Sequence, residues 1–179
     1  MLRIVPAIGC LKKHLEIFRS TPERCQPPSC PACGLAGLWS HGHYARKSDR
    51  DGGELNPIPI PRYLCGKARG CGKTCSSLPS CIAPRRWYLW SVQQAVLLAL
   101  LAGNSIRACA ATCGRARCTV RRWWRWLQTR HERYAFHLRS RWPEWGRTED
   151  WQPFWSRAIA ECGLAELMAY LDGEGLIVP

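Results

Sequence analysis

The pattern of hydrophobic and polar positions divides the chain into two halves. Up to about residue 81, apolar residues are interrupted by glycine, proline and cysteine, which favours loops and short strands. From Ser91 onward, apolar residues recur at the i, i+3, i+4 spacing of amphipathic helices, apart from a tryptophan-rich, turn-prone stretch at about 140–153. Near the N-terminus, Leu11, Leu15 and Phe18 fit one face of a short helix. The sequence therefore predicts an α+β protein.

Two short antiparallel strands are predicted in the first half, at 39–46 and 58–64, joined through the turn-forming residues 49–53. The second strand carries alternating prolines, Pro57, Pro59 and Pro61. Because proline has no backbone N–H, one edge of this strand lacks donors, and we expect that edge to face solvent or a loop. A sheet of this size has little hydrophobic core and needs another source of stability.

The spacing of the cysteines indicates that a bound metal ion provides this stability. Cys30 and Cys33 are separated by two residues, so one tight turn can direct both thiolates at a single ion, and Cys65 and Cys71 form a second, wider pair. We expect residues 66–70 to bulge outward while Cys71 and the following glycine make the tight turn. Four thiolates are a donor set for structural zinc, whose binding contributes roughly 10–16 kcal/mol in small metal-folded domains. The sequence predicts one structural Zn²⁺ held by Cys30, Cys33, Cys65 and Cys71.

Other ligand sets remain open. His41 or His43 could replace a cysteine, and Cys25 could substitute for Cys30, although small half-buried hydrophobic roles are expected for the spare cysteines, which include Cys75 and Cys81. A second cluster would lack a fourth ligand; its members would be Cys109, Cys113 and Cys118. Four thiolates leave no open coordination position for a catalytic water, so we predict no catalytic residues and no enzyme activity.

The second half begins with two predicted helices. Ser91 is a candidate N-cap for the first, and Gly103 can end it. Its expected apolar face comprises Val92, Ala95, Val96, Leu98, Ala99 and Ala102. Ser105 can cap a shorter helix that runs through Thr112, and Gly114 suits a sharp turn into a third helix.

The third helix, predicted at 117–127, is strongly basic. Between Arg115 and Arg130 there are six arginines and no acidic residue, an arrangement that phosphate would offset. The residues at i, i+3, i+4, i+7 should pack inward; they are Val120, Trp123, Trp124 and Leu127. We therefore predict a helix-turn-helix bound to duplex DNA. The residues assigned to the major groove are Arg117, Cys118, Arg121 and Arg122, and those assigned to the DNA backbone are Arg107, Arg115 and Arg125.

Charge and cysteine usage agree with this interpretation. The chain has 26 lysines and arginines against 13 acidic residues, a balance typical of nucleic-acid partners. The N-terminus shows no export signal, and the longest apolar run, 95–102, is too short to span a membrane. We expect a cytoplasmic protein, nucleoid-associated if its source is prokaryotic, in which clustered cysteines bind metal rather than form disulfides.

The C-terminal residues are predicted to form a helical cap. A helical stripe precedes Gly173, made of Leu164, Leu167, Met168 and Leu171, and four tryptophans flank two prolines before it. The predicted organisation is a basic N-terminal segment (1–24), a zinc ribbon (25–81), a helix-turn-helix domain (82–130) and a tryptophan-rich cap (131–179). A homodimer surface is the alternative role for the cap.

In this order of motifs the chain resembles the zinc-ribbon plus helix-turn-helix modules at the N-terminal end of insertion-sequence transposases and their accessory proteins. The matching stretches are Cys30–Gly34, His41–Tyr44, Pro61–Cys65, Gly70–Thr74, Leu101–Ser105 and Thr119–Trp123. The resemblance implies binding to the ends of a mobile element or to an operator. Full transposases of this kind continue into a nuclease-like domain with three metal-binding acidic residues, for which about 50 remaining residues leave no room.

Three classes of function follow from the sequence. The first is a DNA-binding regulator or transposase subunit of a mobile element. The second is the DNA-binding part of a transposase whose catalytic domain lies on a separate chain. The third is an RNA-binding zinc ribbon, in which bases would stack on Trp39, Tyr44 or Tyr63.

Overall fold

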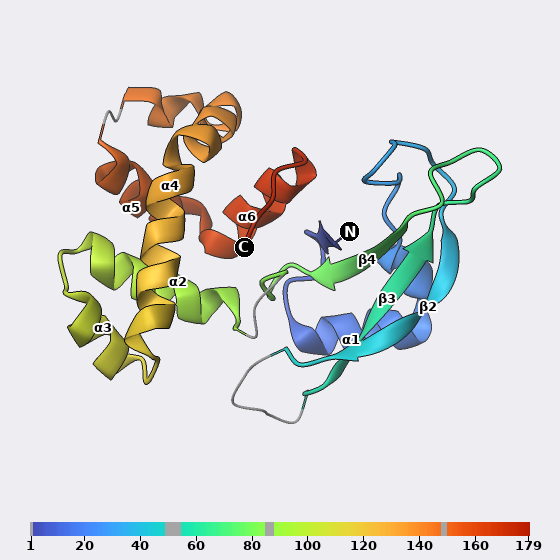
Figure 1. Ribbon diagram of the computed structural model, residues 1–179, viewed down its shortest axis with the longest axis horizontal. Helices are drawn as coiled ribbons and strands as arrows, with labels where there is room; N and C mark the ends of the chain where they lie inside the picture. The colour runs from blue at the N-terminus through green and yellow to red at the C-terminus, as the bar shows by residue number, and fades with distance from the viewer. Residues whose placement is uncertain (1, 49–54, 85–87, 148–149) are drawn as a thin grey trace. The chain divides into compact units, whose positions relative to one another are not determined.

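The computed structural model describes residues 2–48, 55–84, 88–147 and 150–179. These residues form a four-stranded sheet and six α-helices, so the α+β prediction is confirmed (Figure 1). The chain divides into two compact units, the first comprising Met1–Leu89 with Gly175–Pro179 and the second Trp90–Glu174. No helix among the described residues is long and apolar enough to cross a membrane.

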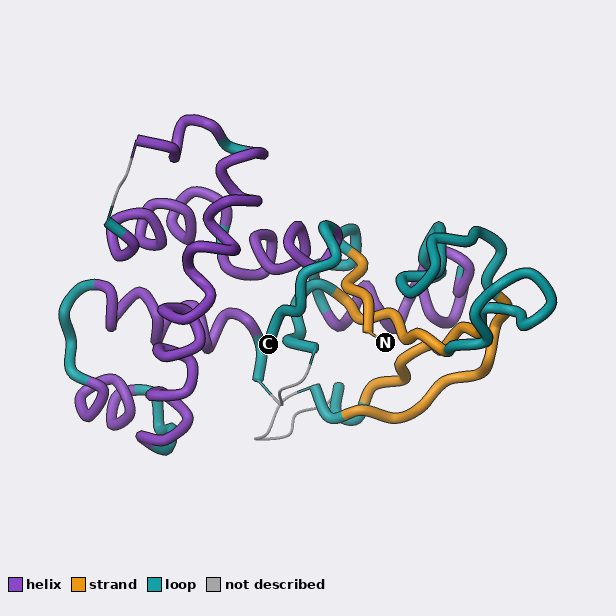
Figure 2. The backbone as a smooth tube through the Cα atoms, turned by 45° about the horizontal axis from the view of Figure 1, so that its top comes forward, coloured by secondary structure: helices purple, strands orange, loops and turns teal. Residues whose placement is uncertain are grey.

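The first unit is built on a mixed sheet with strand order β1-β4-β3-β2. The strands are β1 (Leu2–Val5), β2 (Trp39–Arg46), β3 (Ile58–Leu64) and β4 (Thr74–Pro79). β1 is parallel to β4, and the other neighbours are antiparallel. Figure 2 shows the strands of this unit in orange. The predicted strands 39–46 and 58–64 are confirmed. The turn predicted at 49–53 lies outside the described residues.

Helix α1 (Leu11–Ser20) packs against β3, and a 3-10 turn (Pro22–Cys25) follows it. The central core joins Ile58 and Ile60 of β3 to Leu78 and Ile82, with Leu11 and Leu15 of α1 packed against it. The helical face predicted near the N-terminus is therefore confirmed as far as Leu11 and Leu15 are concerned. β1 pairs with β4, so the N-terminal residues belong to the same compact unit as the cysteine-rich region.

The proline-bearing strand corrects one expectation. β4 pairs with β3 only at Arg62–Leu64, beyond the last proline, so the prolines do interrupt the ladder on one edge. At Pro59, however, that edge faces helix α1 rather than solvent or a loop. The Nε2 of His14, a buried residue of α1, donates a hydrogen bond to the Pro59 carbonyl at 2.7 Å. Helix α1 thus covers β3 at a position where β4 does not pair with it. Burial lowers the pKa of His14 despite this hydrogen bond.

The second unit is helical. It consists of α2 (Trp90–Leu101), α3 (Ile106–Thr112), α4 (Arg117–Arg141), a 3-10 turn (Pro143–Arg147), α5 (Trp151–Cys162) and α6 (Leu164–Gly173). α2, α3 and α4 pack on one another, while α5 and α6 pack on α2. The predicted C-terminal stripe is fully buried: Leu164, Leu167, Met168 and Leu171. The predicted cap on α3 is confirmed, because the Ser105 hydroxyl accepts a hydrogen bond from the Ala108 amide at 3.1 Å.

Two helical predictions are wrong in detail. α2 begins at Trp90, so Ser91 lies inside the helix, and its buried positions are Trp90, Gln93, Val96, Leu97 and Leu100, whereas Ala95 and Ala102 are exposed. This helix is apolar on nearly every side, so its own pattern does not determine which face is buried. The packing of α5 and α6 against it determines that face. The helix predicted at 117–127 continues to Arg141, because no glycine or proline interrupts it and its buried spacing persists through Tyr134 and Leu138.

Candidate metal centre and basic helix

The four predicted cysteines converge at one end of the sheet. The sulfurs of Cys30, Cys33, Cys65 and Cys71 all lie within 4.8 Å of one another and could hold a metal ion. The Cys30 and Cys71 sulfurs are 3.6 Å apart, and those of Cys33 and Cys65 are 3.7 Å apart. A tetrahedral site with metal–sulfur bonds of about 2.3 Å places its sulfurs about 3.8 Å apart, whereas a disulfide needs about 2.05 Å. The spacing fits a shared metal.

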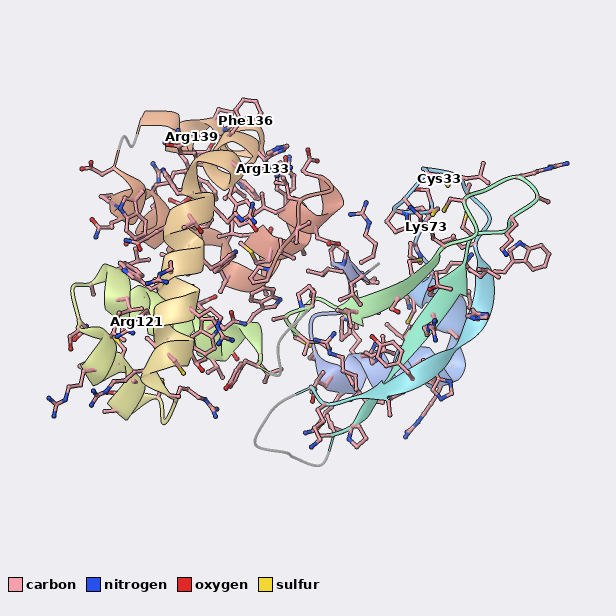
Figure 3. All side chains as sticks on the ribbon, viewed as in Figure 1. Cys33, Lys73, Arg121, Arg133, Phe136 and Arg139 are labelled. Atoms are coloured by element: carbon pink, nitrogen blue, oxygen red, sulfur yellow. The ribbon has the colours of Figure 1, made fainter. Side chains whose placement is uncertain are left out.

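Backbone hydrogen bonds hold each pair of cysteines in a tight loop. In the first loop the Cys30 amide donates to the Leu35 carbonyl at 2.8 Å, and the Ala32 amide points at the Cys30 sulfur at 3.4 Å. In the second, the Cys65 amide donates to the Lys73 carbonyl at 3.0 Å and closes the wider loop. Residues 67–69 are exposed, as the expected outward bulge requires. Figure 3 shows Cys33 and Lys73 at the same end of this unit.

The environment of the sulfurs differs between the two loops. Burial raises the pKa of Cys30, but hydrogen bonds from the Ala32 and Cys33 amides and from neighbouring thiols outweigh it, so that this pKa lies at about 7. For Cys65, the Cys71 amide lowers the pKa, while burial and the surrounding thiols raise it to about 11. Metal ligation requires thiolates, so metal affinity at this cluster should fall as the pH falls.

The alternative ligands lie elsewhere. His41 and His43 are exposed on β2, where the register shifts between Ser40 and His43. The ring of His43 contacts the ring of Phe18 edge-on, with the ring centroids 5.2 Å apart. Cys25 and Cys75 are buried, and burial raises the pKa of both thiols, which fits the hydrophobic roles expected of them. Within the described residues the only metal-ligating group of this kind is the one formed by Cys30, Cys33, Cys65 and Cys71.

Gly70 lies where the cluster leaves no room for a side chain. A Cβ at this position would overlap the Cys65 sulfur, and it would lie 2.8 Å from the Gly66 carbonyl oxygen. We therefore expect Gly70→Ala to displace Cys65 and lower metal affinity at least 10-fold, measured by competition with a chromophoric chelator. Gly9→Ala is the matched control, since nothing lies within 4 Å of its Cβ position. Equal metal affinity in both variants would show that Gly70 is not required for this geometry.

The second candidate site is the exposed face of α4. Val120, Trp123 and Leu127 are buried as predicted, and Trp124 is half-buried. Gly114, with φ +63°, makes the turn that separates α3 from α4. One surface hollow follows the first half of α4, and its lining residues are Cys118, Arg121, Arg122, Arg125, Trp126, Thr129 and Arg130. Figure 3 shows Arg121 in this half of the helix and Arg133 in the other.

The predicted DNA-contacting residues differ in exposure. Arg107 on α3 is exposed, Arg115 in the turn is half-buried, and the α4 residues are exposed: Arg117, Cys118, Arg121, Arg122 and Arg125. Within the part of the chain that the structure describes, no acidic side chain pairs with Arg121, Arg122 or Arg125.

Sequence reasoning missed three residues of this hollow, Trp126, Thr129 and Arg130. Helical spacing could have found them. Trp126 lies four residues after Arg122, Thr129 lies four after Arg125, and Arg130 lies four after Trp126. Sequence reasoning also missed a wider feature of the chain: no acidic residue occurs from Leu55 to His131, although half of the 26 lysines and arginines lie there. That stretch contains Cys65, Cys71 and the first half of α4, so positive charge is shared by both candidate sites.

The comparisons with known proteins identify a family and no activity. A family model described as a domain of unknown function, DUF6431, matches residues 30–123, just over half of the 179 residues. The match runs from Cys30 to Trp123 and so includes all four clustered cysteines, the whole of α2 and α3, and the first turns of α4. No curated protein and no solved structure matches the chain.

Proposed function

Because this chain belongs to the DUF6431 family of domains of unknown function, which assigns no activity, we propose from its two sites that it is a zinc-stabilised protein that binds double-stranded DNA. We propose further that it serves a mobile element, as a regulator or as a transposase subunit that recognises element ends or an operator. The observation that carries the proposal is the exposed trio Arg121, Arg122 and Arg125 on α4, which pair with no acidic side chain among the described residues. They lie on a helix that follows α3 through a sharp turn.

In this proposal the four-cysteine unit is a zinc ribbon. The sulfur separations of 3.6 and 3.7 Å suit four bonds to one Zn²⁺. Cys30 and Cys65 also extend the core that contains Leu38, Tyr63 and Cys75, so the metal would tie both loops to the sheet. Zinc would act here as a structural ion, because four thiolates leave no coordination position for substrate.

The helical unit would supply the DNA contacts. α3, the turn at 113–116 and α4 have the order of a helix-turn-helix, in which the N-terminal part of the second helix enters the major groove. Arg117, Arg121 and Arg122 are exposed on that part of α4 and suit bidentate contact with guanine. Arg107 and Arg125, both exposed, would contact phosphates on either side. The resemblance to transposase modules supports a mobile-element role, in which any catalytic domain would lie on a separate chain.

Duplex binding across a salt series tests this function. The zinc-loaded chain should bind random duplex DNA, and the logarithm of its association constant should fall linearly with the logarithm of salt concentration. About six phosphate contacts would give a slope of about −5. The measurement is fluorescence anisotropy of a labelled duplex between low and moderate salt. A chain that carries zinc and binds no duplex even at low salt would exclude the proposal.

A further inference from the structure

We infer that the four-cysteine unit carries a second nucleic-acid surface, in which Trp39 stacks on an unpaired base beside the cations of the 65–73 loop. The surface is defined here by Leu35, Trp39, Lys67, Arg69 and Lys73 and is called the tryptophan platform. It lies in the first compact unit, whereas the proposed duplex site lies in the second. The proposed duplex site and the tryptophan platform therefore depend on different residues.

The exposure of Trp39 is the first reason. Its side chain is 70% exposed, although an indole is among the largest apolar groups that folding can bury. Leu35, 40% exposed, belongs to the same surface, because it lies 3.3 Å from the Cβ position of Gly70, while the Trp39 Nε1 lies 3.6 Å from the Cβ position of Gly66. One loop thus supports both apolar groups and leaves the indole open to solvent.

Charge decides what this surface binds. Lys67, Arg69 and Lys73 are exposed in the loop next to Trp39, and no acidic residue occurs from Leu55 to His131 or from Arg24 to Ser48. If Zn²⁺ is bound by four thiolates, the centre carries a charge of about −2, which three loop cations more than offset. An exposed aromatic ring beside a loop that carries three cations suits a nucleic acid, since bases stack on the ring while the cations contact phosphates.

The structure also selects the aromatic residue. Tyr63 is buried, and its hydroxyl donates to the Pro22 carbonyl at 3.2 Å, so its ring is not available for stacking. Tyr44 is half-buried in β2. Trp39 begins the same strand, at the edge of the sheet, and every residue from Trp39 to His43 is exposed. An unpaired strand of DNA or RNA could therefore follow this edge without displacing core residues.

The test measures binding of single-stranded oligonucleotides to the full, zinc-loaded chain by fluorescence anisotropy. The probes are an oligothymidylate and an oligouridylate of about 15 nucleotides, and an abasic strand of the same length, which separates stacking from phosphate attraction. Trp39→Ala should weaken binding of the base-bearing strands about 5- to 150-fold, the range for loss of one base–aromatic stack, and should abolish the preference over the abasic strand. Comparing the two base-bearing strands distinguishes DNA from RNA as the source of the base.

Phe136→Ala is the matched control, because this residue of the second unit is also 70% exposed. It should bind every strand like the parent, and Trp39→Phe should keep the preference for base-bearing strands. Zinc content of Trp39→Ala, measured in parallel, should equal that of the parent. A parent chain with no preference for bases over the abasic strand would overturn the platform, and so would a Trp39→Ala variant that retains this preference. Duplex affinity of Trp39→Ala should remain within about 3-fold of the parent, which keeps failure of this inference distinct from failure of the proposed function.

Discussion

Cys65→Ser is expected to release the metal and unfold the first compact unit. Cys65 is buried, its sulfur lies 3.7 Å from that of Cys33, and its amide closes the second loop on the Lys73 carbonyl. A serine hydroxyl is not ionised at neutral pH and does not replace a thiolate. Structural zinc contributes roughly 10–16 kcal/mol in small metal-folded domains, which matches the whole stability of a typical domain, about 5–15 kcal/mol.

The measurement is zinc per chain by elemental analysis, followed by thermal unfolding recorded by circular dichroism. The parent should hold about one zinc and Cys65→Ser well under half of that, with strand signal lost in the variant. A strong chelator should have the same effect on the parent, because Cys33 and Cys71 are exposed to it. Cys10→Ser, an exposed cysteine outside the cluster, is the control and should behave like the parent. Equal zinc content and stability in both variants would disprove the structural role of the site.

The second large effect is expected from the double substitution Arg121→Ala with Arg122→Ala. Both side chains are exposed, line the hollow on α4, and lie in its first turns. An arginine that contacts a base contributes about 1–3 kcal/mol, so loss of the pair should weaken binding to a preferred duplex by roughly 30-fold or more and relax sequence preference. If the arginines touch phosphate instead, binding should weaken uniformly and the salt slope should shrink by about one per residue.

Arg133→Ala is the matched control for this pair. Arg133 is also exposed on α4, and its substitution removes the same charge per residue. It lies about 18 Å farther along the helix axis than Arg121, at about 1.5 Å per residue. Its duplex affinity should stay within about 3-fold of the parent. If the double variant binds duplex DNA as tightly as Arg133→Ala does, α4 is not the recognition helix.

Features that depend on local chemistry could be predicted from the sequence. The bounds of β2 and β3, the Ser105 cap and the convergence of the four cysteines each follow from a short pattern with a specific physical requirement. The wide second cysteine pair was predictable because glycines on both sides permit a bulge, and the structure shows that Gly70 must be small for the chain to pass the Cys65 sulfur.

Features that depend on distant partners could not. β1 is short and pairs in parallel with β4, more than seventy residues later in the sequence, and neither strand has a turn signal that identifies its partner. α2 is apolar almost all round, so α5 and α6 determine which residues it buries. The sequence named Trp39, Tyr44 and Tyr63 as candidates for stacking but could not tell which of them is exposed, because that depends on how the strands pack; the structure exposes Trp39 and buries Tyr63.

Covalent labelling of arginines in the presence of duplex DNA tests the central claim most directly. The zinc-loaded chain would be treated with an arginine-specific dicarbonyl reagent, free and bound to duplex, and each modified residue would be read by peptide mass spectrometry. We predict that DNA protects Arg117, Arg121, Arg122 and Arg125, while Arg133 and Arg141 on the same helix react equally in both states. Protection of Arg133 and Arg141 without protection of Arg121 and Arg122, or equal reactivity of all six, would contradict the account.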